Sequence, residues 1–388
     1  MSHLRTIPTE VVYVTDVSDL PAPSAGVYTL AADTTYIFCN EVDLTGDRIV
    51  CGENTVLRGW SSENCRIKST GLTGTALITS VYSLPMLNLT IEADVALDLD
   101  AADPNYAIDW NGVNFTSCAT VGTIANYGNV IFVNCALLSS ANLTFDGTIG
   151  TVGIDGTLLS GIAGQTTISI PATATITRRF RIIYSAIVAF GGATALDVSA
   201  SATIPVESYI LDTVNFSGGA TYISGVQHSD NKALFTNCKG ISNSASTGMM
   251  TMSGNSTNTT ITTIGTPVKI AGTTALDSSV TQRFSMPTDN RLTYTGAITR
   301  QFRTTAVLTI SSGGNNKELG TTFALNGTVI TTSKMTVTSD GAGRAENAVI
   351  QTVVTLEEND YLELFVQNDD STNNITVSDF NMIVEALN

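Results

Sequence analysis

The amino-acid sequence predicts an all-β protein: a right-handed parallel β-helix followed by an antiparallel jelly-roll sandwich. Runs of Val, Ile, Thr, Phe and Tyr, four to seven residues long, recur between clusters of Gly, Asn, Asp and Ser, which is the pattern of short strands joined by turns. No segment of 12 or more residues keeps the 3.6-residue apolar period of a helix. A set of strand-like motifs also occurs twice in the same order, as expected of a repetitive fold.

The β-helix is predicted for residues 31–254, where the apolar runs are shortest and most regularly spaced. A solenoid of this kind stacks similar coils, each of which contacts mainly its neighbours. The runs that indicate its first coils are Thr35–Phe38, Arg48–Val50, Val56–Arg58, Cys65–Ile67, Ala76–Ile78 and Met86–Leu89.

Internal repetition supports this prediction. Three motifs return at offsets of 99, 101 and 103 residues, so the block is duplicated with two small insertions, which a solenoid accommodates as loops. In the Phe-x-Asn-Cys motif we expect Phe and Cys to point inward and Asn to take a left-handed corner. The motif pairs begin at Ala96 and Ala195, at Val113 and Val214, and at Phe132 and Phe235.

Two further segments follow the β-helix in the predicted order. Residues 255–290 form an extended linker, because nine threonines and few large apolar residues lie between Asn255 and Phe284. Residues 291–388 form the jelly-roll head, with about eight strands and an Asn326-Gly327 hairpin turn. The strand candidates are Ala306–Ile310, Thr322–Leu325, Thr328–Thr331, Met335–Thr338, Val349–Leu356, Tyr361–Gln367, Ile375–Val377 and Phe380–Val384.

Composition excludes several classes of partner. The 388 residues include 18 basic and 34 acidic side chains, for a net charge of −16, so phosphate backbones and anionic membranes are repelled. No apolar stretch approaches the roughly 18 residues of a membrane span. Only 13% of the residues are charged, about half the usual share, which indicates burial against other protein chains.

The N-terminus and the cysteines indicate a protein made in a reducing cytoplasm. Residues 1–10 lack the apolar core of a secretory signal. The six cysteines include no Cys-x-x-Cys pair and the chain has two histidines, so we expect reduced core thiols, no metal site and no cofactor.

The opening coils and the C-terminal part resemble a known kind of protein. Residues 19–23, 33–37 and 44–50 look like the first coils of β-helical bacteriophage tail-spike and fibre proteins. Residues 323–327 and 359–366 are similar to the jelly-roll heads of trimeric fibre and tumour-necrosis-factor-like proteins.

The resemblance implies a homotrimeric structural protein of a phage virion (a spike, fibre or knob) that mediates host attachment. It implies assembly in the host cytoplasm and display on the particle. Residues 1–30 would then dock on other tail or capsid proteins, and the C-terminal domain would face a host surface glycan or protein, through loops such as 311–317 and 367–374. Two alternatives stay open: a polysaccharide depolymerase, and a capsid decoration or cement protein that binds no host.

The depolymerase alternative depends on carboxylates, because paired acids are the usual catalysts of glycoside hydrolysis. The candidates are Asp98, Asp100 and Asp109, in an acidic segment that also contains Glu92, Asp94 and Asp103. Acids at coil corners commonly cap turns, so the sequence favours a protein that is not an enzyme. His228 is interpreted as a solvated turn residue.

Basic residues are few and grouped. Arg178, Arg179 and Arg181 lie in Ile-Thr-Arg-Arg-Phe-Arg, and Arg300 and Arg303 lie in Ile-Thr-Arg-Gln-Phe-Arg. An acidic glycan is one possible partner for these arginines. Ion pairs between the chains of an acidic trimer are the favoured interpretation.

Overall fold

The structure is a computed structural model that describes residues 8–219 and 221–387. The chain divides into two compact units, residues 1–244 and 245–388. Each has its own hydrophobic core. Among the described residues, no helix is long and apolar enough to cross a membrane.

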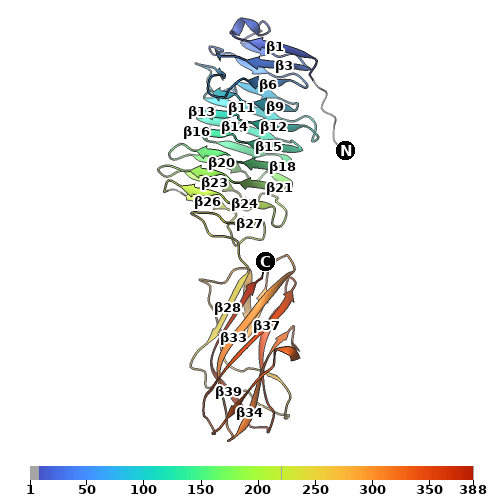
Figure 1. The fold of residues 1–388 in the computed structure, drawn as a ribbon, viewed down its shortest axis with the longest axis vertical. Coiled ribbons are helices and arrows are strands. Elements are labelled where there is room, and N and C mark those ends of the chain that lie inside the picture. The colour runs from blue at the N-terminus through green and yellow to red at the C-terminus, as the bar shows by residue number, and fades with distance from the viewer. Residues whose placement is uncertain (1–7, 220, 388) are drawn as a thin grey trace. The chain divides into compact units, whose positions relative to one another are not determined.

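The first unit is a parallel β-solenoid, as the sequence predicts (Figure 1). Three sheets, which we call A, B and C, run along it. From β3 to β26 each coil contributes one strand to each sheet, in the chain order A, C, B, whereas the first coil has strands only in sheets A and B. Sheet A contains β1 (Glu10–Val14), β3 (Thr34–Phe38), β6 (Val56–Gly59), β9 (Leu84–Leu87), β12 (Ala107–Asn111), β15 (Asn129–Val133), β18 (Thr148–Asp155), β21 (Thr175–Ile183), β24 (Tyr209–Asp212) and β27 (Ala233–Thr236).

The other two sheets complete the coils. Sheet B contains β2 (Val27–Thr29), β5 (Arg48–Val50), β8 (Ile78–Ser80), β11 (Val95–Asp100), β14 (Thr120–Ala125), β17 (Leu143–Asp146), β20 (Thr166–Ile170), β23 (Thr194–Val198) and β26 (Thr221–Gly225). Sheet C contains β4 (Glu41–Asp43), β7 (Arg66–Lys68), β10 (Thr90–Glu92), β13 (Asn114–Thr116), β16 (Ala136–Leu138), β19 (Leu158–Ser160), β22 (Ala186–Val188) and β25 (Asn215–Ser217).

Coil length varies while the strand register is maintained. Thr35 pairs with Val56, 21 residues further on, whereas Phe180 pairs with Tyr209, 29 residues further on. The extra residues lie in the turns, because neighbouring coils remain paired strand by strand. The duplicated motifs also fall on equivalent strands, since β11 and β23, β13 and β25, and β15 and β27 are each four coils apart.

A left-handed corner follows most strands of sheet A. Asn134 and Asn237 adopt φ of 51°, which confirms the corner expected from the Phe-x-Asn-Cys motif. Gly112 and Gly156 occupy the equivalent position in other coils, with φ of 63° and 57°. Asn and Gly tolerate this backbone conformation best, so these residues set the turn from sheet A to sheet C.

The inward side chains form a continuous apolar core. Ring contacts lead from Trp110, stacked on Phe132 at 4.6 Å, through Phe145, Phe180 and Tyr209 to Phe235. All six rings are buried. Each coil therefore contributes large side chains to one shared core, which holds the sheets at fixed separation.

The six cysteines are free thiols, and four of them are buried in this core. Burial raises the pKa of the Cys51 thiol to about 12 and the pKa values of Cys118 and Cys135 to about 11. We expect a thiol reagent to label at most Cys39 and Cys238 in the folded chain and all six cysteines in denaturant, as counted by intact mass. Rapid labelling of four or more thiols without denaturant would contradict the packing.

The second unit is an antiparallel sandwich of two sheets. The five-stranded sheet has the order β30 (Ala275–Leu276), β28 (Thr247–Met252), β39 (Ile375–Ala386), β33 (Arg300–Ser312) and β37 (Glu346–Leu356). The facing sheet has the order β31 (Phe284–Thr288), β32 (Arg291–Tyr294), β38 (Tyr361–Asn368), β34 (Lys317–Leu325) and β35 (Thr328–Val329). In addition, β29 (Val268–Lys269) pairs with β38, and β36 (Met335–Ser339) pairs with β34.

Eight of these strands have the arrangement of a jelly roll. Strands β28, β39, β33 and β37 face β32, β38, β34 and β36, and strands from the two sheets follow one another along most of the chain. Asn326 and Gly327, both with positive φ, join β34 to β35 in the predicted hairpin.

The boundaries of the units differ from the expected ones. Strand β28, assigned from sequence to the β-helix, pairs with β39 of the sandwich. Residues 255–290, expected as a linker, contain β29, β30 and β31, which pair within the sandwich. Two-residue strands such as β29 and β30 leave little apolar pattern in a threonine-rich sequence.

The beginning of the solenoid differs as well. β1 and β2, within the predicted docking segment 1–30, pair with β3 and β5 as part of the first coil. Residues 1–7 of that segment lie outside the described residues. The predicted start at residue 31 is therefore too late, because β1 and β2 are short and interrupted by the turn that contains Pro21 and Pro23.

Candidate functional site

The sequence candidates for catalysis lie on the outer surface of the solenoid. Asp98 and Asp100 are exposed on β11 of sheet B, whereas Asp109 is exposed on β12 of sheet A. The structure therefore brings the first two together and leaves Asp109 on a different face. Side chains two residues apart on one strand are separated by about 7 Å.

The rest of the acidic segment is dispersed. Glu92 lies on β10 of sheet C, where it pairs with Arg66 at 2.7 Å. Asp103 accepts hydrogen bonds from the backbone and side-chain amides of Asn105, both at 2.8 Å. Asp100 accepts one from Asn126 Nδ2 at 2.7 Å. Among the described residues, no three His, Cys, Asp or Glu side chains form a group that could hold a metal ion.

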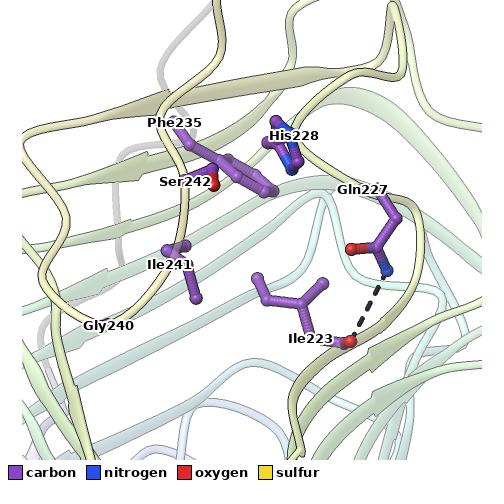
Figure 2. Close-up of a pocket in the computed structure, with 7 residues that line it drawn as sticks. All are labelled: Ile223, Gln227, His228, Phe235, Gly240, Ile241 and Ser242. Carbon is purple, nitrogen blue, oxygen red and sulfur yellow. Dashed lines mark hydrogen bonds between the residues drawn. The ribbon is translucent and has the colours of Figure 1, made fainter. Parts of the chain in front are cut away.

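A pocket of about 300 Å³ lies in the last coil of the solenoid (Figure 2). Its wall combines apolar side chains with the polar groups of Gln227, whose Nε2 donates to the Ile223 carbonyl at 3.5 Å. In the described part of the chain, the imidazole of His228 forms no hydrogen bond with the Ser242 hydroxyl, although both side chains line the pocket. The wall includes Ile223, Gln227, His228, Phe235, Ile241 and Ser242.

Three loops gather at one end of the sandwich, and we call them the loop end: residues 313–316, 340–345 and 369–374. The Gly313 amide donates to the Asn374 carbonyl at 3.2 Å, which joins the first loop to the third. The Ala342 amide donates to Asn315 Oδ1 at 2.6 Å, which joins the second loop to the first. Two loops named from the sequence thus lie side by side.

The loop end presents mainly polar groups to solvent. Asn315, Asn316, Arg344, Thr372 and Asn373 are exposed. Amide and hydroxyl groups of this kind both donate and accept hydrogen bonds, as hydroxyl-rich or peptide ligands require. Sequence reasoning missed the 340–345 loop, although its Asp-Gly-Ala-Gly composition was a usable turn signal.

The comparisons with known proteins give only weak structural similarity. No family model matches the chain, and no curated protein matches it. The active domain of tailspike protein 4 of bacteriophage CBA120 matches with a TM-score of 0.29 and 10% identity, over 91% of this chain and 64% of that chain.

Two matches cover the length of a single domain. Murine APRIL matches with a TM-score of 0.26 and 6% identity, over 36% of this chain and 98% of that chain. The PRD1 vertex protein P5 matches with a TM-score of 0.24 and 14% identity, over 37% of this chain and 96% of that chain. At these TM-scores the fold assignment rests on the strand order of this chain itself: a parallel β-solenoid followed by a jelly roll.

Proposed function

We propose that this chain is a structural protein of a bacteriophage particle, displayed as a homotrimeric spike, fibre or knob, and that it attaches the particle to a host. The observation that carries the proposal is the loop end, where three polar loops are hydrogen-bonded to one another on a packed sandwich. Binding residues concentrate on loops that a rigid scaffold holds in place. The solenoid supplies a second rigid element of nine coils.

Trimerisation gives weak contacts a combined effect. Three identical heads on one assembly turn separate low-affinity contacts into strong attachment. In this proposal residues 1–30 contact other virion proteins, and the loop end contacts a host surface glycan or protein. The net charge of −16 and the low charge content fit a protein that binds protein surfaces rather than nucleic acid.

The experiment that tests attachment changes the loop end in the full chain. The variant Ala342→Arg/Thr372→Arg places two bulky cations among exposed loop residues. We expect particle or protein adsorption to host cells to fall at least tenfold. The control is Glu358→Arg, in the exposed turn between β37 and β38 at the opposite end of the sandwich.

Both variants are compared with the parent chain by assembly state and melting temperature. Unchanged adsorption of the loop-end variant would contradict host attachment through these loops. A parent chain that joins and stabilises the shell but never adsorbs to cells would favour the decoration-protein alternative.

The depolymerase alternative has one specific observation in its favour. The separation of about 7 Å between Asp98 and Asp100 falls within the about 6.5–9.5 Å that inverting glycosidases use. Against it, both carboxylates are exposed on the outer face of sheet B, and the pocket in the last coil contains neither. The two carboxyl groups of a glycosidase need different surroundings, so that one is protonated while the other is ionised. Asp98 and Asp100 are both exposed on the same strand.

We therefore expect no release of reducing ends from host polysaccharide, in the parent chain or in Asp98→Ala, Asp100→Ala and Asp109→Ala variants. The measurement is a reducing-end assay on purified capsular or lipopolysaccharide glycan. Activity that disappears in Asp98→Ala or Asp100→Ala and persists in Asp197→Ala, an equivalent position on β23, would establish the depolymerase instead.

A further inference from the structure

The three outer faces of the solenoid differ sharply in chemistry. On sheet B, one outward column consists of small polar residues and aspartates from successive coils, with Asp98 between Thr79 and Thr123. Short side chains of this kind are well hydrated. The column is Thr79, Asp98, Thr123, Thr144, Ser169, Asp197 and Ser224.

Sheet C satisfies its charges within the chain. Arg66 pairs with Glu92 at 2.7 Å and with Glu41 at 3.5 Å. Lys68 pairs with Glu41 at 2.6 Å. These ion pairs link β4, β7 and β10, so the charged half of this face needs no partner chain.

Sheet A presents outward apolar residues along its whole length. Val11 is 52% exposed and Tyr13 is 56% exposed, and partly buried Ile, Leu and Val follow in later coils. Polar residues interrupt them in the earlier coils, among them Arg58, Asp109 and Asn111, but this many outward apolar residues on one face is typical of a protein–protein interface. We call these apolar residues the strip. It contains Val11, Tyr13, Val56, Leu87, Ile131, Val133, Ile183, Ile210 and Leu234.

In the coils of β18 and β21, unpaired charges of opposite sign lie in the two outward columns that also contain the strip. Arg181 points outward between Gly153 and Ile210, and its Nε is buried without a hydrogen-bond partner. The Asp155 carboxylate accepts no hydrogen bond from any described residue. Asp155 lies in the same outward column as Ile183. This column is two residues along the strand from the column of Arg181, so the two columns are about 7 Å apart.

Of the neighbouring charged residues, Arg179 adds to the basic side. It is exposed on the same side as Arg181 and lies opposite Thr151. Asp212 follows Ile183 in the column of Asp155, and its carboxylate already accepts from the Thr236 hydroxyl at 2.9 Å. Arg178 is likewise satisfied within the chain, because its Nη2 donates to the Gly128 carbonyl at 2.9 Å.

Glycines beneath the arginines make room for this arrangement. A Cβ at Gly150 would lie 2.6 Å from Arg178 Nη2, and one at Gly153 would lie 4.0 Å from Arg181 Nη2. Both guanidinium groups therefore pack close to the backbone of β18, and Arg181 lies beside the apolar strip.

We infer that sheet A is the face through which copies of this chain pack, and that Arg181 of one copy pairs with Asp155 of the next. This inference rests on the proposed homotrimer. In a cyclic trimer, one edge of a face meets the opposite edge of the neighbouring copy, so a basic edge and an acidic edge on the same face are complementary. The outer end of the Arg181 guanidinium, which has no acceptor among the described residues, gains one in the Asp155 carboxylate.

The apolar strip and the charges have separate roles in this interface. Burial of the strip supplies most of the binding free energy. Arg181 on β21 and Asp155 on β18 lie one coil apart, a step that the long Arg181 side chain spans. A shift that adds a further coil, about 4.8 Å, separates the charges.

The test exchanges the two charges in the full chain. Arg181→Glu and Asp155→Arg each place like charges opposite one another, and we expect each to weaken assembly at least tenfold in native mass spectrometry over a dilution series. The double variant Asp155→Arg/Arg181→Glu restores opposite charges in reversed order, and we expect it to regain most of the parent affinity.

Matched controls lie on sheet B, where Asp98→Arg and Arg48→Glu make the same charge changes at outward positions. We expect both to assemble as the parent chain does. Melting temperatures of the single variants close to that of the parent chain show that the single variants fold.

Two outcomes would overturn the inference. If the parent chain is a trimer and Arg181→Glu assembles equally well, the trimer stands but sheet A is not its interface. If the double variant assembles no better than the single variants, the pairing of Arg181 with Asp155 is wrong. A monomeric parent chain would overturn both the trimer and this interface.

Discussion

Replacing Phe180 with alanine is expected to lower the free energy of unfolding of the solenoid by about 3–5 kcal/mol. Phe180 is fully buried and contacts Phe145 at 5.9 Å and Tyr209 at 5.5 Å between ring centroids. Its removal leaves a cavity in the middle of the stack, and parallel strands on both sides keep the walls from closing. Tryptophan fluorescence follows this unit, because Trp60 and Trp110 both lie in the solenoid.

The matched control for this substitution is Tyr209→Phe. The Tyr209 hydroxyl is buried without a hydrogen-bond partner, and burial raises the pKa of this phenol. Removing an unsatisfied buried hydroxyl is neutral or stabilising, by up to about 1 kcal/mol. If Phe180→Ala costs less than about 1 kcal/mol, or Tyr209→Phe costs as much as Phe180→Ala, the inner ring stack does not hold the coils together.

Replacing Glu363 with glutamine is expected to destabilise the sandwich by about 2–3 kcal/mol. The Glu363 side chain is 3% exposed, and its Oε1 accepts from Lys269 Nζ at 2.9 Å and Arg291 Nε at 3.3 Å. These bonds fasten β29 and β32 to β38. Because both cations are one-third exposed, water stabilises them in part after the substitution, so the cost lies below that of a fully buried pair.

Differential scanning calorimetry measures this effect. Because the sandwich contains no tryptophan, its calorimetric transition is the one that tryptophan fluorescence does not follow. The control is Arg344→Ala, which removes pairs with Asp340 and Glu346 from a side chain that is 61% exposed. Exposed pairs contribute about 0–1 kcal/mol. Equal effects of the two substitutions would mean that Glu363 is no more important than a surface charge.

Much of the solenoid was predictable from the sequence because its rules are local. Alternating burial within each strand, and Asn or Gly at the left-handed corner, both follow from neighbouring residues. The two copies of Phe-x-Asn-Cys are enough to identify the corner from the sequence alone. Tyr184 was not predictable in this way, because it takes the same corner with φ of 48° although it is neither Asn nor Gly.

The division between the units was less predictable. Strand β28, Thr247–Met252, alternates in the same way as a solenoid strand, and only its pairing with β39, more than 120 residues further on, assigns it to the sandwich. Pairing over such separations leaves no local signal. The short strands β29 and β30 were missed for the same reason.

The candidate sites show the same limit. Sequence spacing placed Asp98, Asp100 and Asp109 within 12 residues of one another, yet the coil carries Asp109 onto another sheet. The loop end was predicted in part, because turn composition identified two of its loops, but their proximity depends on the sandwich topology. The contrast between the faces of sheets A, B and C emerges only when the register is known.

The measurement that tests the central claim most directly is native mass spectrometry of the full chain at micromolar concentration. A homotrimer of 40.7 kDa chains gives a species of about 122 kDa that persists on tenfold dilution. A single species of 40.7 kDa under these conditions would contradict the account of a trimeric particle protein.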